Sequence, residues 1–247
     1  MKRFLEITRN LVFPPHCAGC HALLSPTQCK EKAVFCPECA KEWVAELCLQ
    51  CPTCFAPYPE CRCQPPSLAK AGSKALLKLA PYGDTPRERV IRNIVLDAKR
   101  NPRRRVLAWM ARELSVTLAV ELDKLGWDPT HTVLVHLPRD ARSVRRFGAD
   151  QAAALAGALA REMNLSHQSL LCRKKRTKPQ KSLNAKARAE NLRAVFGVRP
   201  LPQECRVILV DDVVTTGATL CAAAQALRDA GVTDVLCVAM AQTPKKG

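Results

Sequence analysis

The sequence lacks several features that would assign it to a common class of protein. No apolar run approaches the ~18 residues of a membrane-spanning helix, so no membrane span is expected. The N-terminal stretch MKRFLEITRNLVFPP is broken by Glu6, Arg9 and Asn10, and it lacks the continuous apolar core of a secretory signal peptide. We interpret it as a short amphipathic helix that ends at the two prolines, and we expect the protein to be cytoplasmic.

Aromatic residues are scarce, and two common nucleotide-binding motifs are missing. Aromatic side chains make up 4% of the 247 residues, which leaves few surfaces on which bases of single-stranded nucleic acid could stack. Trp43, Phe55, Tyr58 and Tyr82 are expected to be core residues. Neither GxxxxGK[ST] nor GxGxxG occurs. Positive charge is abundant, because 39 Lys and Arg against 22 Asp and Glu give a net charge of +17, which predicts attraction to polyanions.

The cysteines divide the chain. Ten of the 14 lie between Cys17 and Cys63, and in a reducing compartment such a cluster predicts metal binding before disulfides. Each closely spaced pair can present two thiolates to one ion, and two pairs complete a tetrahedral zinc site. We therefore predict two zinc ions, one held by Cys17, Cys20, Cys36 and Cys39 and the other by Cys51, Cys54, Cys61 and Cys63.

Other ligand choices are open from the sequence alone. Cys29 and Cys48 are left over, Cys48 allows a different second set, and His16 or His21 could replace a cysteine. Disulfides are a further alternative, which the missing signal peptide disfavours. A closed four-thiolate site has no open position for a substrate, so both zinc ions are expected to be structural. A segment of about 50 residues buries little apolar surface, whereas zinc stabilises such folds by on the order of 10 kcal/mol.

The composition changes after Cys63, where Gln64-Pro-Pro-Ser indicates a linker. We divide the chain into residues 1–66, a double zinc-ribbon-like module, and residues 67–247. In the second part, short apolar runs alternate with helical patterns, which predicts an α/β fold with a parallel sheet covered by helices on both faces. Strands are expected at residues 73–82, 132–137, 170–173, 207–210 and 232–240, and helices at residues 85–100, 103–125, 151–163, 183–195 and 220–230.

The stretch VILVDDVVTTGATL, residues 207–220, combines an apolar strand with a polar turn. Asp211 and Asp212 follow the apolar run, and Thr215-Thr216-Gly217-Ala218-Thr219 lead into the next helix. In open α/β sheets, ligands bind beyond the carboxyl ends of strands. Carboxylates can accept hydrogen bonds from a diol, and the N–H groups at a helix N-terminus can bind phosphate. Ribose 5-phosphate carries both groups. An ordinary helix cap would explain one of the threonines, but not the whole pattern.

This stretch resembles the motif with which type I phosphoribosyltransferases bind 5-phosphoribosyl 1-pyrophosphate (PRPP). Together with the N-terminal cysteines, it makes the chain similar to the ComF/GntX family. The similarity extends to VHLP at residues 135–138, to the arginines that follow it, and to RKKRTKPQKSL at residues 173–183. The family's compact RGFNQ is replaced here by Arg146-Phe-Gly-Ala-Asp-Gln151, which is one residue longer and lacks the asparagine.

The resemblance implies a role for each matching position. Asp211 and Asp212 would hold the ribose hydroxyls of PRPP with the help of Mg²⁺, and they would stabilise the oxocarbenium-like charge that develops at C1. Residues 215–219 would bind the 5-phosphate. Further implied residues are Leu137 and Arg139 at the pyrophosphate, and Arg173, Arg176, Thr177 and Gln180 in a mobile hood over the site.

Two classes of function follow from the resemblance. In the first, the protein transfers the 5-phosphoribosyl group to an unidentified acceptor in DNA uptake or utilisation. In the second, it is a non-catalytic accessory that binds single-stranded DNA and senses PRPP, with a DNA-uptake helicase or other competence proteins as partners. Basic clusters at residues 139–146 and 173–181 flank the expected PRPP site, whereas residues 99–105 fit a solvated surface equally well. His136 lies in an apolar strand and is expected to be packed.

Overall fold

The computed structural model describes residues 14–100, 103–139, 150–174, 195–202 and 205–244. Its centre is a sheet in the order β1-β8-β7-β3-β4, with β2 also paired to β8, and every one of these pairings is parallel. β5 and β6 form a separate antiparallel pair. The strands are β1 (Ser73–Leu77), β2 (Ala80–Pro81), β3 (Thr132–His136), β4 (Ser166–His167), β5 (Leu171–Arg173), β6 (Phe196–Val198), β7 (Arg206–Val214) and β8 (Val235–Gln242).

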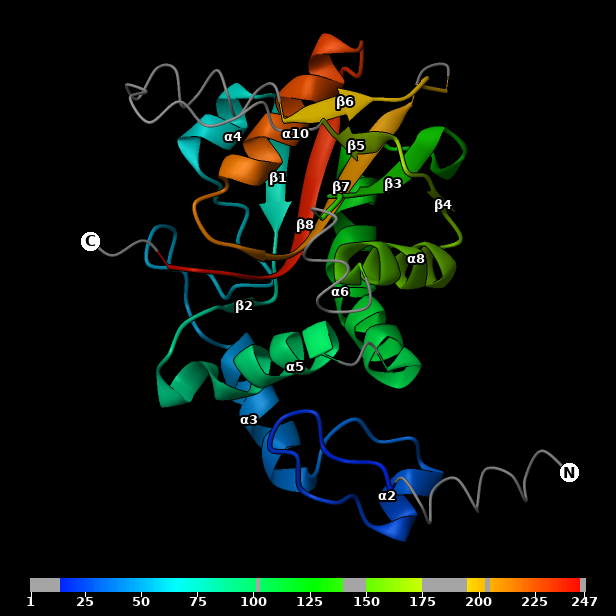
Figure 1. Cartoon of the computed structure of the whole chain (residues 1–247). Coiled ribbons are helices and arrows are strands. Elements are labelled where there is room, and N and C mark those ends of the chain that lie inside the picture. Colours follow the sequence, from blue (N-terminus) through cyan, green and yellow to red (C-terminus); the bar gives the residue numbers. More distant parts are fainter. Residues whose placement is uncertain (1–13, 101–102, 140–149, 175–194, 203–204, 245–247) are drawn as a thin grey trace, which may run out of the picture.

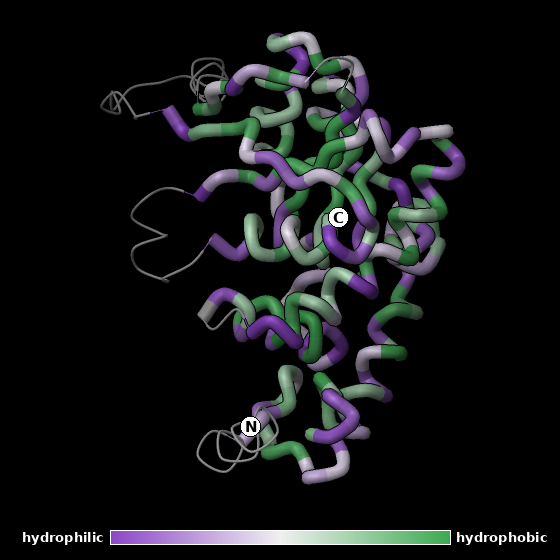
Figure 2. Tube along the Cα trace, turned by 90° about the vertical axis from the view of Figure 1, so that its right-hand side faces the viewer, coloured by the Kyte–Doolittle hydropathy of each residue, from purple (hydrophilic) through white to green (hydrophobic). Residues whose placement is uncertain are grey.

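Helices cover both faces of the sheet, as the sequence predicts (Figure 1). One face packs against α5 (Arg89–Arg100), α6 (Arg104–Leu125) and α8 (Gln151–Met163), and the other against α4 (Pro66–Lys70) and α10 (Ala218–Asp229). Strand β7 supplies both cores, because successive side chains point to opposite faces. Ile208 and Val210 join the first core, and Val207 and Leu209 join the second. In Figure 2, hydrophobic segments run through the interior of the trace.

Local sequence signals account for several boundaries. A 3₁₀ turn at Pro86–Glu88 precedes α5, and the N–H of Thr85 donates to Glu88 Oε2 at 3.1 Å in a capping box. The predicted apolar face of α5 (Val90, Ile91, Ile94 and Val95) is fully buried. Helix α8 has the predicted bounds, and its N-terminus is capped by Asp150. Of the described helices, none combines the length and apolar composition needed to cross a membrane.

Strand β7 is longer than predicted, and this corrects the expected position of the aspartates. Its pairing with β8 continues from Asp211↔Ala239 to Val214↔Gln242. Asp211 and Asp212 therefore lie inside the strand, whereas the sequence placed them after its end. Helix α10 begins two residues before the predicted start, and β8 covers 235–242 instead of 232–240. The predicted helices in residues 1–13 and 183–194 lie outside the described residues.

The cysteine-rich segment continues the core of the second part. It contains α2 (Pro26–Lys30) and α3 (Pro37–Leu47), which lie beyond α5 at the end of the molecule away from β6 (Figure 1). Phe35 and Trp43 belong to the same buried cluster as α5 and α6. Trp109 contacts both of these rings edge to face, with centroids 4.9 and 5.1 Å away. The boundary at residue 66 stays a prediction, but one apolar core crosses it.

Candidate functional site

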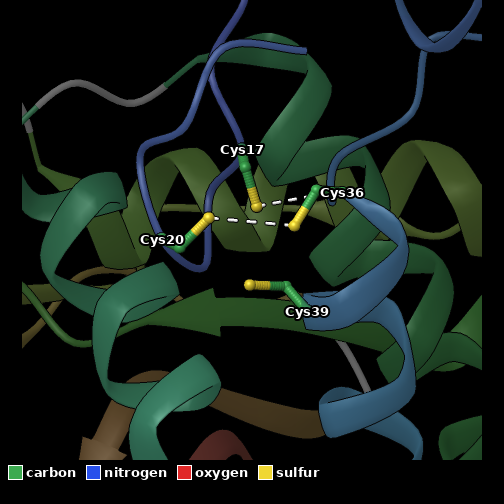
Figure 3. A group of neighbouring side chains, drawn as sticks. All are labelled: Cys17, Cys20, Cys36 and Cys39. Atoms are coloured by element: carbon green, nitrogen blue, oxygen red, sulfur yellow. Dashed lines mark hydrogen bonds between the residues drawn. The ribbon is translucent and has the colours of Figure 1, made fainter. Parts of the chain in front are cut away.

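The first cysteine tetrad forms where a turn meets the N-terminus of α3. The Sγ atoms of Cys17, Cys20, Cys36 and Cys39 lie within 4.8 Å of one another and point into a common space (Figure 3). Cys20 Sγ and Cys36 Sγ are 3.8 Å apart. Four sulfurs bound tetrahedrally at ~2.3 Å from zinc are separated by about this distance. The backbone N–H groups of Gly19 and Cys36 each donate to Cys17 Sγ at 3.3 Å, which favours the thiolate that zinc requires.

The second tetrad lies between α3 and α4. The Sγ atoms of Cys51, Cys54, Cys61 and Cys63 also lie within 4.8 Å of one another, and the Cys63 N–H donates to Cys61 Sγ at 3.4 Å. Both predicted groupings are confirmed, and each could hold a structural zinc ion. The leftover cysteines have other positions: Cys29 Sγ donates to the Leu24 carbonyl at 3.6 Å, and Cys48 is exposed at the end of α3.

Each tetrad is accompanied by a cation from the second part of the chain. Arg89 Nη2 lies 3.5 Å from Cys39 Sγ, and Arg89 also pairs with Glu42. Lys78 in the turn after β1 is fully buried, and its Nζ donates to the carbonyls of Cys63 at 2.6 Å, Leu76 at 3.2 Å and Cys61 at 3.4 Å. Zinc with four thiolates has a net charge of −2, so nearby cations offset a buried negative group. The donor sets and their surroundings therefore fit zinc.

The predicted phosphate loop connects β7 to α10 and borders a small open hollow. Asp211, Val213, Val214, Thr215 and residues 217–220 line this hollow. Gly217 has φ +75°, a left-handed conformation that glycine adopts without strain, and α10 begins at the next residue. Thr215, Thr216 and Thr219 are exposed. The helix N-terminus therefore directs N–H groups to the same hollow that Asp211 lines.

The segment after the second tetrad packs against this loop. A Cβ on Gly217 would lie 2.7 Å from Pro65 Cγ, so only glycine permits this approach. Further along α10, Cys221 Sγ donates to the Ser67 carbonyl at 3.2 Å. Helix α10 is thus held against α4, which begins shortly after the last cysteine of the second tetrad.

The two aspartates of β7 face opposite sides of the sheet, because they are successive residues of one strand. Asp211 faces the α10 loop, and its Oδ1 accepts the Asp212 N–H at 2.8 Å. Asp212 faces α5 and α8 and is 6% exposed. Asp212 Oδ2 accepts from Arg139 Nη2 at 2.9 Å and pairs with Lys99 Nζ at 3.2 Å, while Oδ1 accepts the Val213 N–H at 2.7 Å. Burial, with the neighbouring charge of Asp212, raises the pKa of Asp211.

The turn after β3 contains the two predicted pyrophosphate residues and lies beside Asp212. Leu137 is buried, and its N–H donates to the Val210 carbonyl at 3.2 Å, which ties the turn to β7. The Arg139 N–H donates to Asp150 Oδ2 at 3.2 Å, and Arg139 Nη2 also donates to Gln151 Oε1 at 3.0 Å. Of the two, only Arg139 therefore offers a polar side chain to a ligand.

The first predicted hood residue reaches the same turn. Arg173 Nε donates to the Pro138 carbonyl at 2.9 Å, and the Arg173 guanidinium lies 5.5 Å from the centre of the Phe196 ring. The structure therefore brings the start of the expected hood beside the expected pyrophosphate residues. Outside the described residues lie Arg176, Thr177 and Gln180, together with the arginines at 142, 145 and 146.

Lys99 is the site residue that the sequence reasoning missed. The sequence left open whether its basic cluster is a solvated surface or binds anions, whereas in the structure Lys99 contacts Asp212. The available signal was its position four residues after the buried Val95 on α5, since residues four apart share a helix face. His136 is packed as expected: it is 8% exposed, and its Nδ1 lies 3.0 Å from His167 Nε2. Burial lowers the pKa of both rings.

Comparison with known proteins agrees with this geometry. Residues 149–247 match the phosphoribosyl transferase domain family. Competence protein F of Haemophilus influenzae is 37% identical over 94 residues, and the alignment covers 36% of this chain and 41% of that protein, so it spans less than half of either. The family match begins after the cysteine-rich segment and includes β7, its two aspartates and the loop before α10.

Proposed function

We propose that this chain, whose residues 149–247 match the phosphoribosyl transferase domain family, binds PRPP with Mg²⁺ and transfers the 5-phosphoribosyl group to an acceptor. The observation that carries the proposal is the shared hollow of Asp211 and the β7–α10 loop. The N–H groups at the start of α10 receive the 5-phosphate, and the Asp211 carboxylate faces the ribose hydroxyls.

The proposed reaction breaks the bond between C1 of the ribose and pyrophosphate, which leaves with the bonding electron pair. A bond from C1 to the acceptor forms, and the acceptor loses a proton. A carboxylate near the ring would stabilise the positive charge that develops at C1, while Arg139 and Lys99, which both contact Asp212, would stabilise the departing anion. Bound Mg²⁺ would neutralise further charge on the pyrophosphate.

The two cysteine tetrads have a structural role in this proposal. Four thiolates around each zinc ion leave no coordination position for PRPP or an acceptor. The relative aligned with this chain is named Competence protein F, and we extend from that name a role in DNA uptake or utilisation.

Calorimetry with PRPP and Mg²⁺ tests the binding step. Asp211→Ala should weaken PRPP binding by about tenfold or more, since a hydrogen bond to a charged group contributes about 1.5–3 kcal/mol. Asp229→Ala is the matched control, because this exposed aspartate lies at the far end of α10. Equal affinities for the wild-type protein and Asp211→Ala would contradict the proposal.

Pyrophosphate release separates transfer from sensing. A screen of nucleobases, with and without single-stranded DNA, should identify an acceptor that releases pyrophosphate from PRPP. Binding of PRPP without release by any acceptor would favour the sensing function. The first basic cluster gives the DNA-binding alternative little support, because Lys99 contacts Asp212, Arg103 contacts Asp97 at 2.6 Å and Arg105 contacts the His16 carbonyl at 3.5 Å.

A further inference from the structure

The two aspartates of β7 have different surroundings, and we propose that they have different ligands. This inference rests on the proposed function. Asp211 serves the ribose, whereas Asp212 is a positioning residue that holds Lys99 and Arg139 ready for the pyrophosphate of PRPP. Lys99 is then a catalytic residue contributed by α5, outside the matched domain.

The contacts of Asp212 indicate that it does not bind the ribose. One carboxylate oxygen accepts from Arg139 and Lys99 together, and the other accepts a backbone N–H. With its side chain 9% exposed, Asp212 has little capacity left for a ribose hydroxyl. Asp211 lines the hollow of the phosphate loop on the opposite face of the strand.

The two cations that contact Asp212 can also contact a ligand. Lys99 and Arg139 share the Asp212 carboxylate, and the Asp150 carboxylate accepts the Arg139 backbone N–H. Lysine and arginine each carry several N–H donors, so both side chains can also donate to an anion with several oxygens, such as pyrophosphate. Gln151, which is 1% exposed, accepts from Arg139 Nη2 and donates to the Val95 carbonyl at 3.4 Å. This contact fixes the arginine beside the strand.

Calorimetry with two partial ligands, each with Mg²⁺, tests the division. Lys99→Met should weaken inorganic pyrophosphate binding by about tenfold and leave ribose 5-phosphate binding unchanged. Asp212→Asn should also weaken pyrophosphate binding, because it releases the two cations from their fixed positions. Asp211→Ala should weaken ribose 5-phosphate binding and spare pyrophosphate. Lys99→Arg should restore part of the pyrophosphate affinity, which a purely structural role would not predict.

Lys74→Met is the matched control, since Lys74 pairs with Asp234 at 2.9 Å where β1 and β8 begin. It should leave both affinities unchanged. If Lys99→Met weakened the binding of both ligands equally, or of neither, the division between the two aspartates would be overturned. The proposal that the protein binds PRPP would still stand. Absence of PRPP binding to the wild-type protein would instead overturn the proposed function, and this inference with it. Thermal unfolding of each variant separates a loss of affinity from a loss of folding.

Discussion

The two cysteine tetrads have the same chemistry but different neighbours. The first packs against α5, where Arg89 approaches Cys39 and Asn93 Nδ2 donates to the Gly19 carbonyl at 2.6 Å. The second packs against the sheet, where the buried Lys78 donates to the carbonyls of Cys61 and Cys63. Two residues after Cys63, Pro65 contacts Gly217 of the phosphate loop.

Because of this difference, we expect the first tetrad to affect stability alone and the second to affect both stability and ligand binding. The first tetrad holds a helical interface, whereas the second fixes a segment that also borders the β7–α10 loop. From the spacing of the cysteines in the sequence, the two sites look the same. The spacing predicts which sulfurs come together, but not which other residues they contact. Loss of the second ion should therefore affect PRPP binding more than loss of the first.

Loss of a metal ligand should have the largest effect. Cys39→Ser and Cys61→Ser should each remove one zinc ion per chain and destabilise the protein by several kcal/mol, since zinc binding contributes on the order of 10 kcal/mol to such folds. Only Cys61→Ser should also weaken PRPP binding at a temperature where both variants are folded. Zinc content, thermal unfolding and calorimetry measure these effects, with Cys48→Ser as the control. Equal loss of PRPP affinity in both variants would contradict the comparison.

Removal of the buried lysine should have the next largest effect. Lys78→Met leaves the carbonyls at Cys61, Cys63 and Leu76 without this donor, and an unsatisfied buried acceptor costs about 1–3 kcal/mol. Zinc at the second tetrad should also be held about 10–100-fold more weakly, as for other groups that support metal ligands. Competition with a chelator measures this affinity. Retention of zinc as tight as in Lys74→Met would show that Lys78 does not support the site.

Gly217→Ala tests the contact between the second tetrad's segment and the phosphate loop. The new Cβ would meet Pro65 Cγ at 2.7 Å, and the left-handed backbone adds about 1–2 kcal/mol for a residue with a Cβ. PRPP affinity should fall. Pro65→Ala removes Cγ, so the double variant should recover part of the loss, and a double-mutant cycle measures this coupling. Additive effects would show that Pro65 does not influence the loop.

The sequence predicts local features of this molecule better than its tertiary contacts. The cysteine groupings, the bounds of α8 and the buried face of α5 follow from spacing and periodicity. The end of β7 does not, because β8 continues the pairing to Gln242. Phe55 is predicted to be a core residue, yet it is 71% exposed, directly after the turn that ends at Cys54. The spacing from Val95 places Lys99 on the buried face of α5, but its partner Asp212 lies in a strand more than a hundred residues away, which spacing does not identify.

The smallest expected effect is on how the free energy of unfolding varies with pH, and it arises at the interface of the first tetrad. Glu46 of α3 is 4% exposed and accepts the N–H groups of Val90 at 2.7 Å and Ile91 at 2.8 Å. Burial raises the pKa of Glu46 to about 7, although these two hydrogen bonds oppose the shift.

Because the pKa is higher in the folded protein, the folded state binds more protons than the unfolded state between the ordinary value of 4.5 and about 7. The free energy of unfolding should therefore fall as pH rises through this window, by at most about 1.4 kcal/mol per pH unit for one proton. Glu46→Gln should remove this contribution, whereas Glu31→Gln, at an exposed position, should retain it. Denaturant unfolding at several pH values measures the slopes, and identical slopes in the two variants would show that the Glu46 carboxyl does not titrate in this window.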